Sequence, residues 1–185
     1  MKNILIVTGH PYADSSVGNK EIVRHLLERY PSAQHSDLAS LYPDYQVDIE
    51  AEREKLLWAD VIIIQSPLFW YSMTSLIMRW FEEVFTHGWA YGSKGHALDG
   101  KQVLIGLTAG GTGYEAGGEM GITVDDLLKP IQLIFDYCRM DYLGAIFTEG
   151  MFNTGNATAE QVVAMKTLAK QHSQDMIDLL DKAYL

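Results

Sequence analysis

Residues 61–65 read VIIIQ, a short run in which apolar β-branched side chains occupy successive positions. Successive side chains of a strand point to opposite faces of a sheet, so both faces of this segment are apolar. Such a strand is stable only when other elements cover both of its faces. The run therefore predicts a buried strand of a parallel sheet that lies between two layers of helices.

Similar apolar runs and longer amphipathic segments alternate along the rest of the chain. The pattern predicts strands at residues 4–8, 34–37, 61–65, 102–108 and 143–147, and helices at residues 16–30, 50–58, 73–86, 124–138 and 159–183. This alternation is typical of α/β proteins with a parallel sheet and right-handed crossovers. Five strands fit a flavodoxin-like doubly wound sheet in the order 2-1-3-4-5, with helices on both faces and a single domain at residues 1–185.

Three features of the predicted helices and loops have two interpretations each. Pro130 lies inside the segment 124–138, where proline is tolerated only if the helix kinks or begins nearer to that residue. Trp80 and Phe81 form an aromatic stripe that packs either in the core or against a second copy of the chain. His87, in the stretch HGWAYG, is either structural or close to the site.

The composition argues against some classes of partner and site. The formal net charge is −10, so the surface as a whole repels the phosphate backbone of nucleic acids, and nucleic-acid binding is not expected. The single cysteine, Cys138, cannot form an intramolecular disulfide, and no Cys/His spacing indicates a metal site. Cys138 is expected to be a buried thiol in a reducing compartment, with a reactive thiol as the alternative.

No segment of the sequence suggests export or a membrane span. The N-terminal apolar run at residues 4–7 is too short for the apolar core of a signal peptide. No window approaches ~18 uninterrupted apolar residues. We therefore expect a cytoplasmic protein, which leaves room for peripheral attachment at the inner face of the cell membrane.

The loop after the first strand has the residues of a phosphate site. In a doubly wound sheet, ligands bind beyond the carboxyl ends of the strands, so the loops after the first, third and fourth strands are expected to converge. The first loop, GHPYADSSVGNK at residues 9–20, leads into a helix N-terminus, whose free N–H groups suit a phosphate. Ser15, Ser16, Asn19 and His10 add donors, although Ser16 is alternatively only a helix cap. Because the sequence lacks GxxxxGK[ST] and GxGxxG, one terminal phosphate fits better than a pyrophosphate.

The other two loops supply aromatic side chains and glycines. The third strand is followed by SPLFWYS at residues 66–72, and the fourth by TAGGTGYEAGG at residues 108–118. Glycines let the backbone come close to a ligand, and the aromatic side chains provide a flat wall. A phosphate cradle, an aromatic wall and a glycine-rich edge together suit a flat ring with a phosphate tail. FMN is the obvious candidate.

These segments resemble the flavodoxin-like NAD(P)H:quinone oxidoreductases, the group that contains DT-diaphorase. The chain looks most similar to bacterial members that serve as ancillary subunits of glutathione-gated potassium efflux systems. The matching segments cover most of residues 3 to about 150, and the stretch from PLFWYS to HGWAYG, residues 67–92, is the most specific.

The resemblance implies FMN or FAD as cofactor and a homodimer with its active sites at the subunit interface. It also implies a two-electron, ping-pong transfer of hydride from NAD(P)H to a quinone. The phosphate and ribityl tail would be surrounded by His10, Ser16, Val17, Gly18 and Asn19. The isoalloxazine would lie along Leu68, Phe69, Trp70 and Tyr71, and its polar edge would meet Thr108, Ala109, Gly110, Gly111 and Tyr114. Tyr114 is also the catalytic candidate, and the substrate pocket would include Trp70, Tyr71 and Tyr91.

The chain departs from DT-diaphorase at two points. DT-diaphorase pairs a tyrosine with a histidine in the loop after the fourth strand, whereas here no histidine follows Tyr114 in that loop. Protons are then supplied by water or Glu119, or no side chain is needed. The segment between the second strand and the LYPDY motif is also short for an adenine pocket, which favours FMN over FAD.

Two other functions stand beside the reductase. The chain is alternatively a regulatory subunit that docks on and activates a membrane potassium efflux transporter. A flavodoxin-type electron carrier is a third interpretation. The aromatic residues of HGWAYG disfavour the carrier because they suggest a pocket for a substrate ring.

Overall fold

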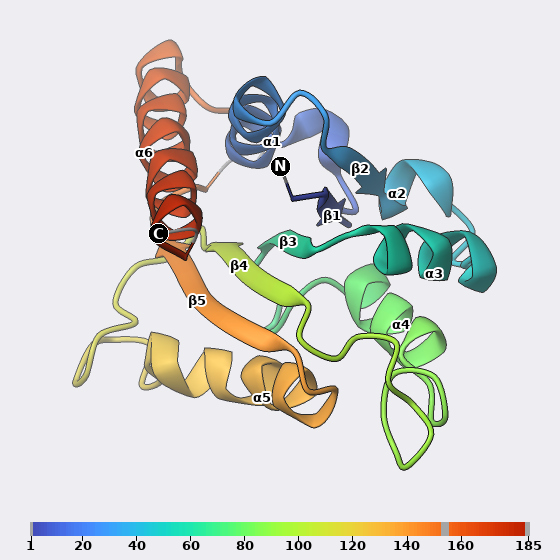
Figure 1. Ribbon diagram of the computed structural model, residues 1–185. Helices are drawn as coiled ribbons and strands as arrows, with labels where there is room; N and C mark the ends of the chain where they lie inside the picture. Colours follow the sequence, from blue (N-terminus) through green and yellow to red (C-terminus); the bar gives the residue numbers. More distant parts are fainter. Residues whose placement is uncertain (1, 153–155, 184–185) are drawn as a thin grey trace.

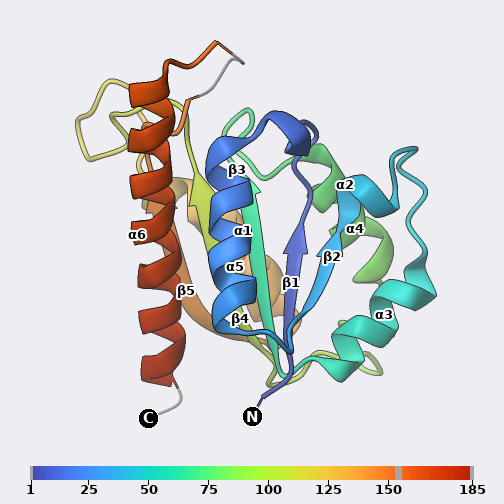
Figure 2. The ribbon, with the colours of Figure 1, turned by 90° about the horizontal axis from the view of Figure 1, so that it is seen from above.

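The computed structural model describes residues 2–152 and 156–183. Its centre is a five-stranded parallel sheet with the strand order β2-β1-β3-β4-β5. The strands are β1 (Ile4–Thr8), β2 (Gln34–Asp37), β3 (Val61–Pro67), β4 (Gln102–Thr108) and β5 (Asp141–Thr148). In Figure 2 the strands run in one direction, with their carboxyl ends at the top. The predicted flavodoxin-like fold and strand order are confirmed.

Helices cover both faces of the sheet (Figure 1). One face carries α1 (Val17–Arg29) and α6 (Ala159–Ala183), and the other carries α3 (Ile49–Trp58), α4 (Ser75–Val84) and α5 (Val124–Tyr137). A short helix α2 (Leu38–Leu41) and a 3-10 turn at Ala13–Ser15 were not predicted. Both are about one turn long, too short to show a hydrophobic period in the sequence.

The apolar run of β3 is buried on both sides, as its sequence predicts. Ile62 and Ile64 belong to the apolar cluster beneath α3, α4 and α5, whereas Val61 and Ile63 belong to the cluster beneath α1 and α6. All four side chains are fully buried. Successive residues of one strand therefore join the two halves of the core.

The structure decides between the alternatives left open for the predicted helices. Thr123 and Asp126 form a capping box at the start of α5, so a helix that begins nearer to Pro130 is wrong and the proline lies inside it. Trp80 and Phe81 are 0% and 5% exposed within the single chain. Their interpretation as core residues is confirmed, and a dimer contact through these rings is wrong.

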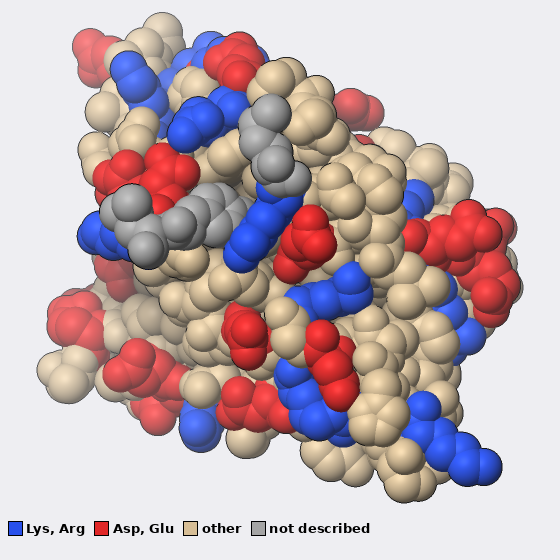
Figure 3. Space-filling model, viewed as in Figure 1, with Lys and Arg blue, Asp and Glu red and all other residues tan. Residues whose placement is uncertain are grey.

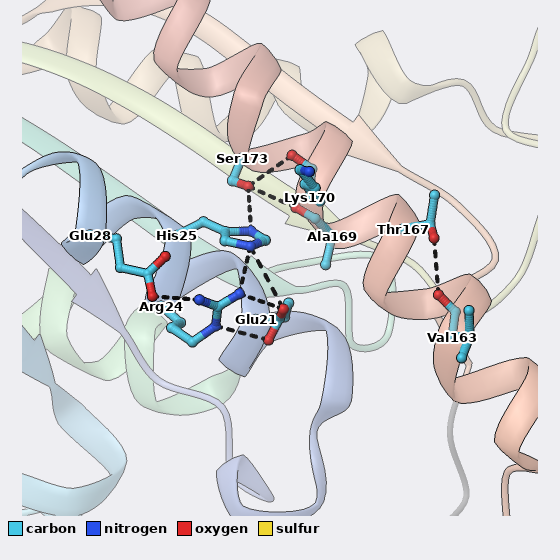
Figure 4. Close-up of polar contacts among 9 residues, drawn as sticks. All are labelled: Glu21, Arg24, His25, Glu28, Val163, Thr167, Ala169, Lys170 and Ser173. Atoms are coloured by element: carbon cyan, nitrogen blue, oxygen red, sulfur yellow. Dashed lines mark hydrogen bonds and ion pairs between the residues drawn. The ribbon is translucent and has the colours of Figure 1, made fainter.

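Helices α1 and α6 are joined by polar contacts (Figure 4). The Nδ1 of His25 on α1 lies 3.1 Å from the Oγ of Ser173 on α6, and that hydroxyl also donates to the Ala169 carbonyl. On the exposed side of α1, Arg24 pairs with Glu21 and Glu28. These contacts place α6 against the sheet beside α1.

A buried carboxylate connects the elements on the other face. Glu52 on α3 is 0% exposed. Its oxygens accept hydrogen bonds from four side chains, those of Ser36, Tyr42, Lys55 and Trp80. A buried charge requires such partners, and here they come from β2, the end of α2, α3 itself and α4.

The remaining surface features bear on possible partners. On the face seen in Figure 3, acidic and basic side chains are interspersed. Among the described residues, no helix combines the length and apolar character that a membrane crossing requires.

The described part of the chain also contains no cluster of three or more His, Cys, Asp or Glu side chains that is placed to hold a metal ion. Cys138 is 2% exposed, and burial raises its pKa to about 11.

Candidate functional site

A cavity of about 380 Å³ opens at the carboxyl edge of the sheet. It is bounded by the loops after β1, β3, β4 and β5. Its lining consists of His10, Tyr12, Ser15, Ser16, Val17, Gly18, Asn19, Pro67, Leu68, Phe69, Thr108, Gly110, Gly111, Tyr114, Met151 and Phe152. The three loops expected to converge therefore meet at one cavity.

The N-terminus of α1 forms one end of the cavity. Ser16 is the N-cap, and its Oγ accepts the backbone N–H of Asn19 at 3.4 Å. Gly18 is needed for close packing, because a Cβ there would lie 2.8 Å from the sulfur of Met151. Ser16 is thus a helix cap and a cavity residue at once, and the free N–H groups of the first turn create a positive end suited to an anion.

His10 lies beside this helix end with its ring oriented by two contacts. Its Nδ1 accepts the backbone N–H of Tyr12 at 3.0 Å, and its ring meets Phe69 edge-on at 5.8 Å. Burial lowers the pKa of His10, although nearby Asp37 opposes the shift. Because Nδ1 accepts, the hydrogen of the neutral ring is on Nε2, which is then a donor.

The aromatic segment after β3 forms a strained turn. Phe69 and Ser72 exchange two backbone hydrogen bonds of 2.9 and 3.1 Å, and the two central residues, Trp70 and Tyr71, have φ of 49° and 61°. Positive φ at both central positions is the signature of a type I′ turn, which normally carries Asn and Gly. Left-handed backbone costs roughly 1–2 kcal/mol for each ordinary residue. In this turn Trp70 is 94% exposed and Tyr71 is 53% exposed.

The glycine loop after β4 is tied to the end of β5. The carboxylate of Glu149 accepts the backbone N–H groups of Gly113 at 3.3 Å and Tyr114 at 3.0 Å. Tyr114 is 7% exposed, and its ring packs edge-on against Phe147 at 5.3 Å. Burial, followed by nearby Tyr71 and Glu149, raises the pKa of Tyr114. Its hydroxyl therefore stays protonated and able to donate.

Two residues that follow β5 also line the cavity, and the sequence reasoning missed them. A Cβ at Gly110 would lie 2.7 Å from Cδ2 of Phe152, so this ring packs directly on the glycine loop. Met151 packs on Gly18 in the same way. The rule that ligands bind beyond the carboxyl ends of strands applies to β5 as well, and it was the available signal.

Four of the predicted site residues do not line the cavity. Trp70 and Tyr71 follow the lining residue Phe69 in the chain, and the N–H and C=O of Ala109 pair with Thr148 and Met151. Tyr91 belongs to the loop that connects α4 to β4 in the chain, and the centroid of its ring lies 5.0 Å from that of Tyr137. All the other residues predicted to hold the cofactor are in the lining.

A second cavity of about 190 Å³ adjoins the first and shares His10, Ser16 and Asn19 with it. Two carboxylate residues, Asp14 and Asp37, belong to its lining. Lys20 and His35 belong to the same lining, so the second cavity adds two carboxylates, a lysine and a second histidine to the hydroxyl and amide groups that it shares with the first.

Sequence comparison agrees with this architecture. The family described as "Flavodoxin-like fold" matches residues 2–172. The chain belongs to this family. Among relatives, it is 36% identical to the uncharacterized NAD(P)H oxidoreductase YrkL of Bacillus subtilis (strain 168), over 97% of this chain and 98% of the relative.

Two further similarities concern an efflux-system protein and a solved structure. The chain is 35% identical to the glutathione-regulated potassium-efflux system ancillary protein KefF of Enterobacter sp. (strain 638), over 95% of this chain and 96% of that protein. The structure of general stress protein 14 of Treponema denticola, in complex with FMN, matches with a TM-score of 0.84 and 26% identity, over 96% of this chain and 99% of the other.

Proposed function

We propose that this chain is an FMN-dependent NAD(P)H:quinone oxidoreductase that transfers two electrons in a ping-pong cycle. The observation that carries the proposal is the cavity at the carboxyl edge, where a helix N-terminus, an aromatic turn and a glycine loop meet. FMN, when bound, supplies the acceptance and donation of hydride. The side chains and backbone of this protein then bind and orient the reactants.

The donor set at one end of the cavity suits a phosphate. Ser16 and Asn19 lie at the start of α1, and His10 directs an Nε2–H donor from the preceding loop. An anion at this position also meets the positive end of the helix dipole. Glu and Asp side chains are absent from the lining of this cavity, so no carboxylate among its described residues opposes an anion there.

The other end of the cavity suits a flat heterocycle. Leu68 and Phe69 give it an apolar side, and Phe69 also begins the turn that carries Trp70 and Tyr71. The glycine loop offers backbone N–H groups where negative charge would develop, and such donors stabilise it without reorganising. The protonated hydroxyl of Tyr114 adds a donor, which supports its assignment as the catalytic residue.

FMN fits the surroundings better than FAD. A pyrophosphate that continued from the phosphate end would approach the smaller cavity, whose lining contains Asp14 and Asp37. The negative charges of Asp14 and Asp37 would oppose a second phosphate there. Of the basic groups there, Lys20 already pairs with Asp14, at 3.8 Å to the carboxylate and 2.8 Å to the carbonyl oxygen.

We place the substrate pocket at the exposed turn of Trp70 and Tyr71 and complete it with a second copy of the chain. Trp70 and Tyr71 present large apolar surfaces there that the single chain leaves uncovered. In the proposed homodimer, Tyr91 of one subunit contributes to the substrate pocket. Trp70→Ala and Tyr91→Ala should then raise KM for the quinone. A protein that sediments as a monomer at micromolar concentration would contradict the shared pocket.

The central test is reconstitution with FMN followed by turnover. We expect one FMN per chain, retained through gel filtration, and oxidation of NADH or NADPH that depends on a benzoquinone. Initial rates at several fixed quinone concentrations should give parallel double-reciprocal lines. A protein that binds no flavin would overturn the proposal. Flavin binding without quinone-dependent turnover would leave an electron carrier instead.

The similarity to KefF favours a second role, as a regulatory subunit of a potassium efflux transporter. The two roles are compatible, since one surface can bind a transporter while the cavity binds flavin. Potassium efflux from cells that express such a transporter, measured with and without this chain, tests the second role. Unchanged efflux would contradict it.

A further inference from the structure

A buried histidine of α6 is linked to the cavity by a continuous series of hydrogen bonds. His172 is 0% exposed and lies in none of the cavities described above. Its Nδ1 is 2.8 Å from Oγ1 of Thr148, and its Nε2 is 3.0 Å from Oε1 of Gln65 on β3. The amide of Gln65 donates to Oδ1 of Asn19 on α1 at 3.0 Å. The series therefore runs from α6 to α1 along the face of the sheet that these two helices cover (Figure 1).

The final link reaches two hydroxyl groups of the cavity. The side-chain amide of Asn19 donates to Oγ1 of Thr108 at 3.2 Å and to Oγ of Ser16 at 3.4 Å. Both hydroxyl residues line the larger cavity. Asn19 thus uses both of its N–H groups on these oxygens and its own oxygen on Gln65.

The direction of every link follows from the chemistry of the groups. The oxygen of Gln65 only accepts, so His172 must carry its hydrogen on Nε2. Burial lowers the pKa of His172 to about 4, so the ring is neutral near pH 7 and Nδ1 accepts from the hydroxyl of Thr148. Protonation of the ring would reverse only the Thr148 link, because Nε2 donates in both states.

Gly106 makes the crossing of β4 possible. A Cβ at this position would overlap Oε1 of Gln65 and would lie 2.8 Å from Nε2 of His172. The position is in the middle of β4, between Ile105 and Leu107, where a larger apolar residue would otherwise suit a buried strand. The missing side chain leaves room for the bond between Gln65 and His172.

The consequence concerns the hydrogens of Ser16 and Thr108. Both oxygens accept from Asn19, and within residues 2–152 and 156–183 neither hydroxyl donates to a protein acceptor. A hydroxyl whose oxygen already accepts has its hydrogen available for a different partner. Both hydrogens are thus available to an acceptor in the cavity, at the positive end of α1.

We propose that His172 is a positioning residue that, through Gln65 and Asn19, commits the hydroxyls of Ser16 and Thr108 to donate into the cavity and so selects ligands with a terminal phosphate. The proposal rests on the flavin site proposed above. A purely structural histidine would stabilise the fold equally for every ligand. A positioning histidine affects the preference for FMN over riboflavin, which lacks the phosphate.

The test compares dissociation constants for FMN and riboflavin, measured by quenching of flavin fluorescence at pH 7. The wild-type protein should bind FMN more tightly than riboflavin. His172→Leu, which removes the donor, should reduce that preference about tenfold by weakening FMN binding while the dissociation constant for riboflavin stays within about twofold. His172→Gln, which presents an N–H near the position of Nε2, should restore most of it.

Ser173→Ala is the matched control. Ser173 is the neighbouring buried polar residue of α6, and its hydrogen bonds within the described part of the chain go to α1 and to its own helix. It should keep the wild-type preference. If circular dichroism shows that His172→Leu does not fold, Gln65→Met replaces it in the test. This substitution removes the hydrogen bonds from Gln65 to His172 and to Asn19, and it should reduce the preference for FMN by the same factor.

The outcomes separate the two proposals. The positioning role alone would be overturned if a folded His172→Leu variant kept the wild-type preference for FMN. It would also be overturned if that variant lost affinity for FMN and riboflavin by the same factor. A wild-type protein that binds riboflavin as tightly as FMN would also overturn it, and would leave a flavin site without phosphate selection. A wild-type protein that binds neither ligand would overturn the proposed function as well.

Discussion

The carboxylate of Glu149, at the end of β5, accepts the backbone N–H of Tyr114, in the loop after β4, at 3.0 Å. The same carboxylate accepts the N–H of Gly113, whose φ of 97° is accessible to glycine and strained for other residues. One side chain that directly follows the edge strand therefore holds two backbone N–H groups of a loop that is rich in glycine. Without it, the loop would have to lose more conformational freedom on binding a ligand.

Glu149→Ala should therefore weaken flavin binding. We expect a dissociation constant about tenfold higher, since hydrogen bonds to a charged group contribute about 1.5–3 kcal/mol. Glu119→Ala is the matched control, because it removes an equal charge from an exposed position of the same loop. Equilibrium titration of both variants with FMN measures the difference. Equal dissociation constants for the two variants would contradict a specific role of the Glu149 contacts in holding the loop.

A substitution in the strained turn at residues 69–72 should raise the stability of the ligand-free protein and lower its affinity for flavin. In Trp70→Asn, asparagine tolerates the left-handed backbone better than tryptophan, and little buried area is lost because Trp70 is 94% exposed. The ligand-free variant should be more stable by about 1 kcal/mol in urea denaturation. Its flavin affinity should fall, by analogy with base–aromatic stacking at about 1–3 kcal/mol per ring. If the ligand-free variant were less stable than the wild-type protein, the left-handed backbone at Trp70 would not be a source of strain.

The buried carboxylate of Glu52 leads to a prediction about stability alone. Glu52→Ala leaves the donors of Ser36, Tyr42 and Trp80 without the carboxylate that accepts from them, and it removes the ion-pair partner of Lys55. We expect a loss of about 3 kcal/mol in the free energy of unfolding. Glu54→Ala, at an exposed position of the same helix, should cost less than about 0.5 kcal/mol. Similar losses in both variants would show that the network contributes little.

His172 leads to a prediction about pH. Burial lowers its pKa from 6.5 to about 4, so the unfolded chain binds its proton more readily than the folded protein does. Its contribution to stability is complete above pH 6.5 and is lost as the pH falls toward 4. His172→Gln should therefore show a smaller loss of stability than the wild-type protein between these pH values. Parallel urea titrations along the pH series measure this, and identical slopes would contradict it.

The sequence predicted the bounds of β1, β2 and β4, whereas the prediction for β3 ended two residues early and that for the edge strand β5 was too short at both ends. The run at residues 61–65 predicted β3 because both of its faces are buried. β5 begins at Asp141, two residues before the predicted start, and its residues are only partly buried. Gly144, with φ of 127°, lies next to a register shift against β4. A half-exposed edge strand with an irregularity lacks the continuous apolar signal that marks a central strand.

The site residues were predictable where the topology placed them and not where a turn type or a distant contact did. Ser16 and Asn19 follow from the rule on strand ends. The conformation of Trp70 and Tyr71 could not be predicted, because aromatic residues have no preference for the left-handed backbone of a type I′ turn. His172 pairs with a residue 107 positions away in the chain, and no local pattern indicates such a contact.

The cavity described above is bounded by loops that follow four different strands, from residue 10 near the start of the chain to Phe152 near its end. Its walls come together only when the sheet is complete, so partly folded chains contain no such cavity. A ligand that contacts all four loops therefore cannot bind to an early transition state for folding. It should slow the unfolding of the native protein and leave the rate of folding nearly unchanged. Retention of the ligand would thereby extend the lifetime of the folded chain rather than guide its formation.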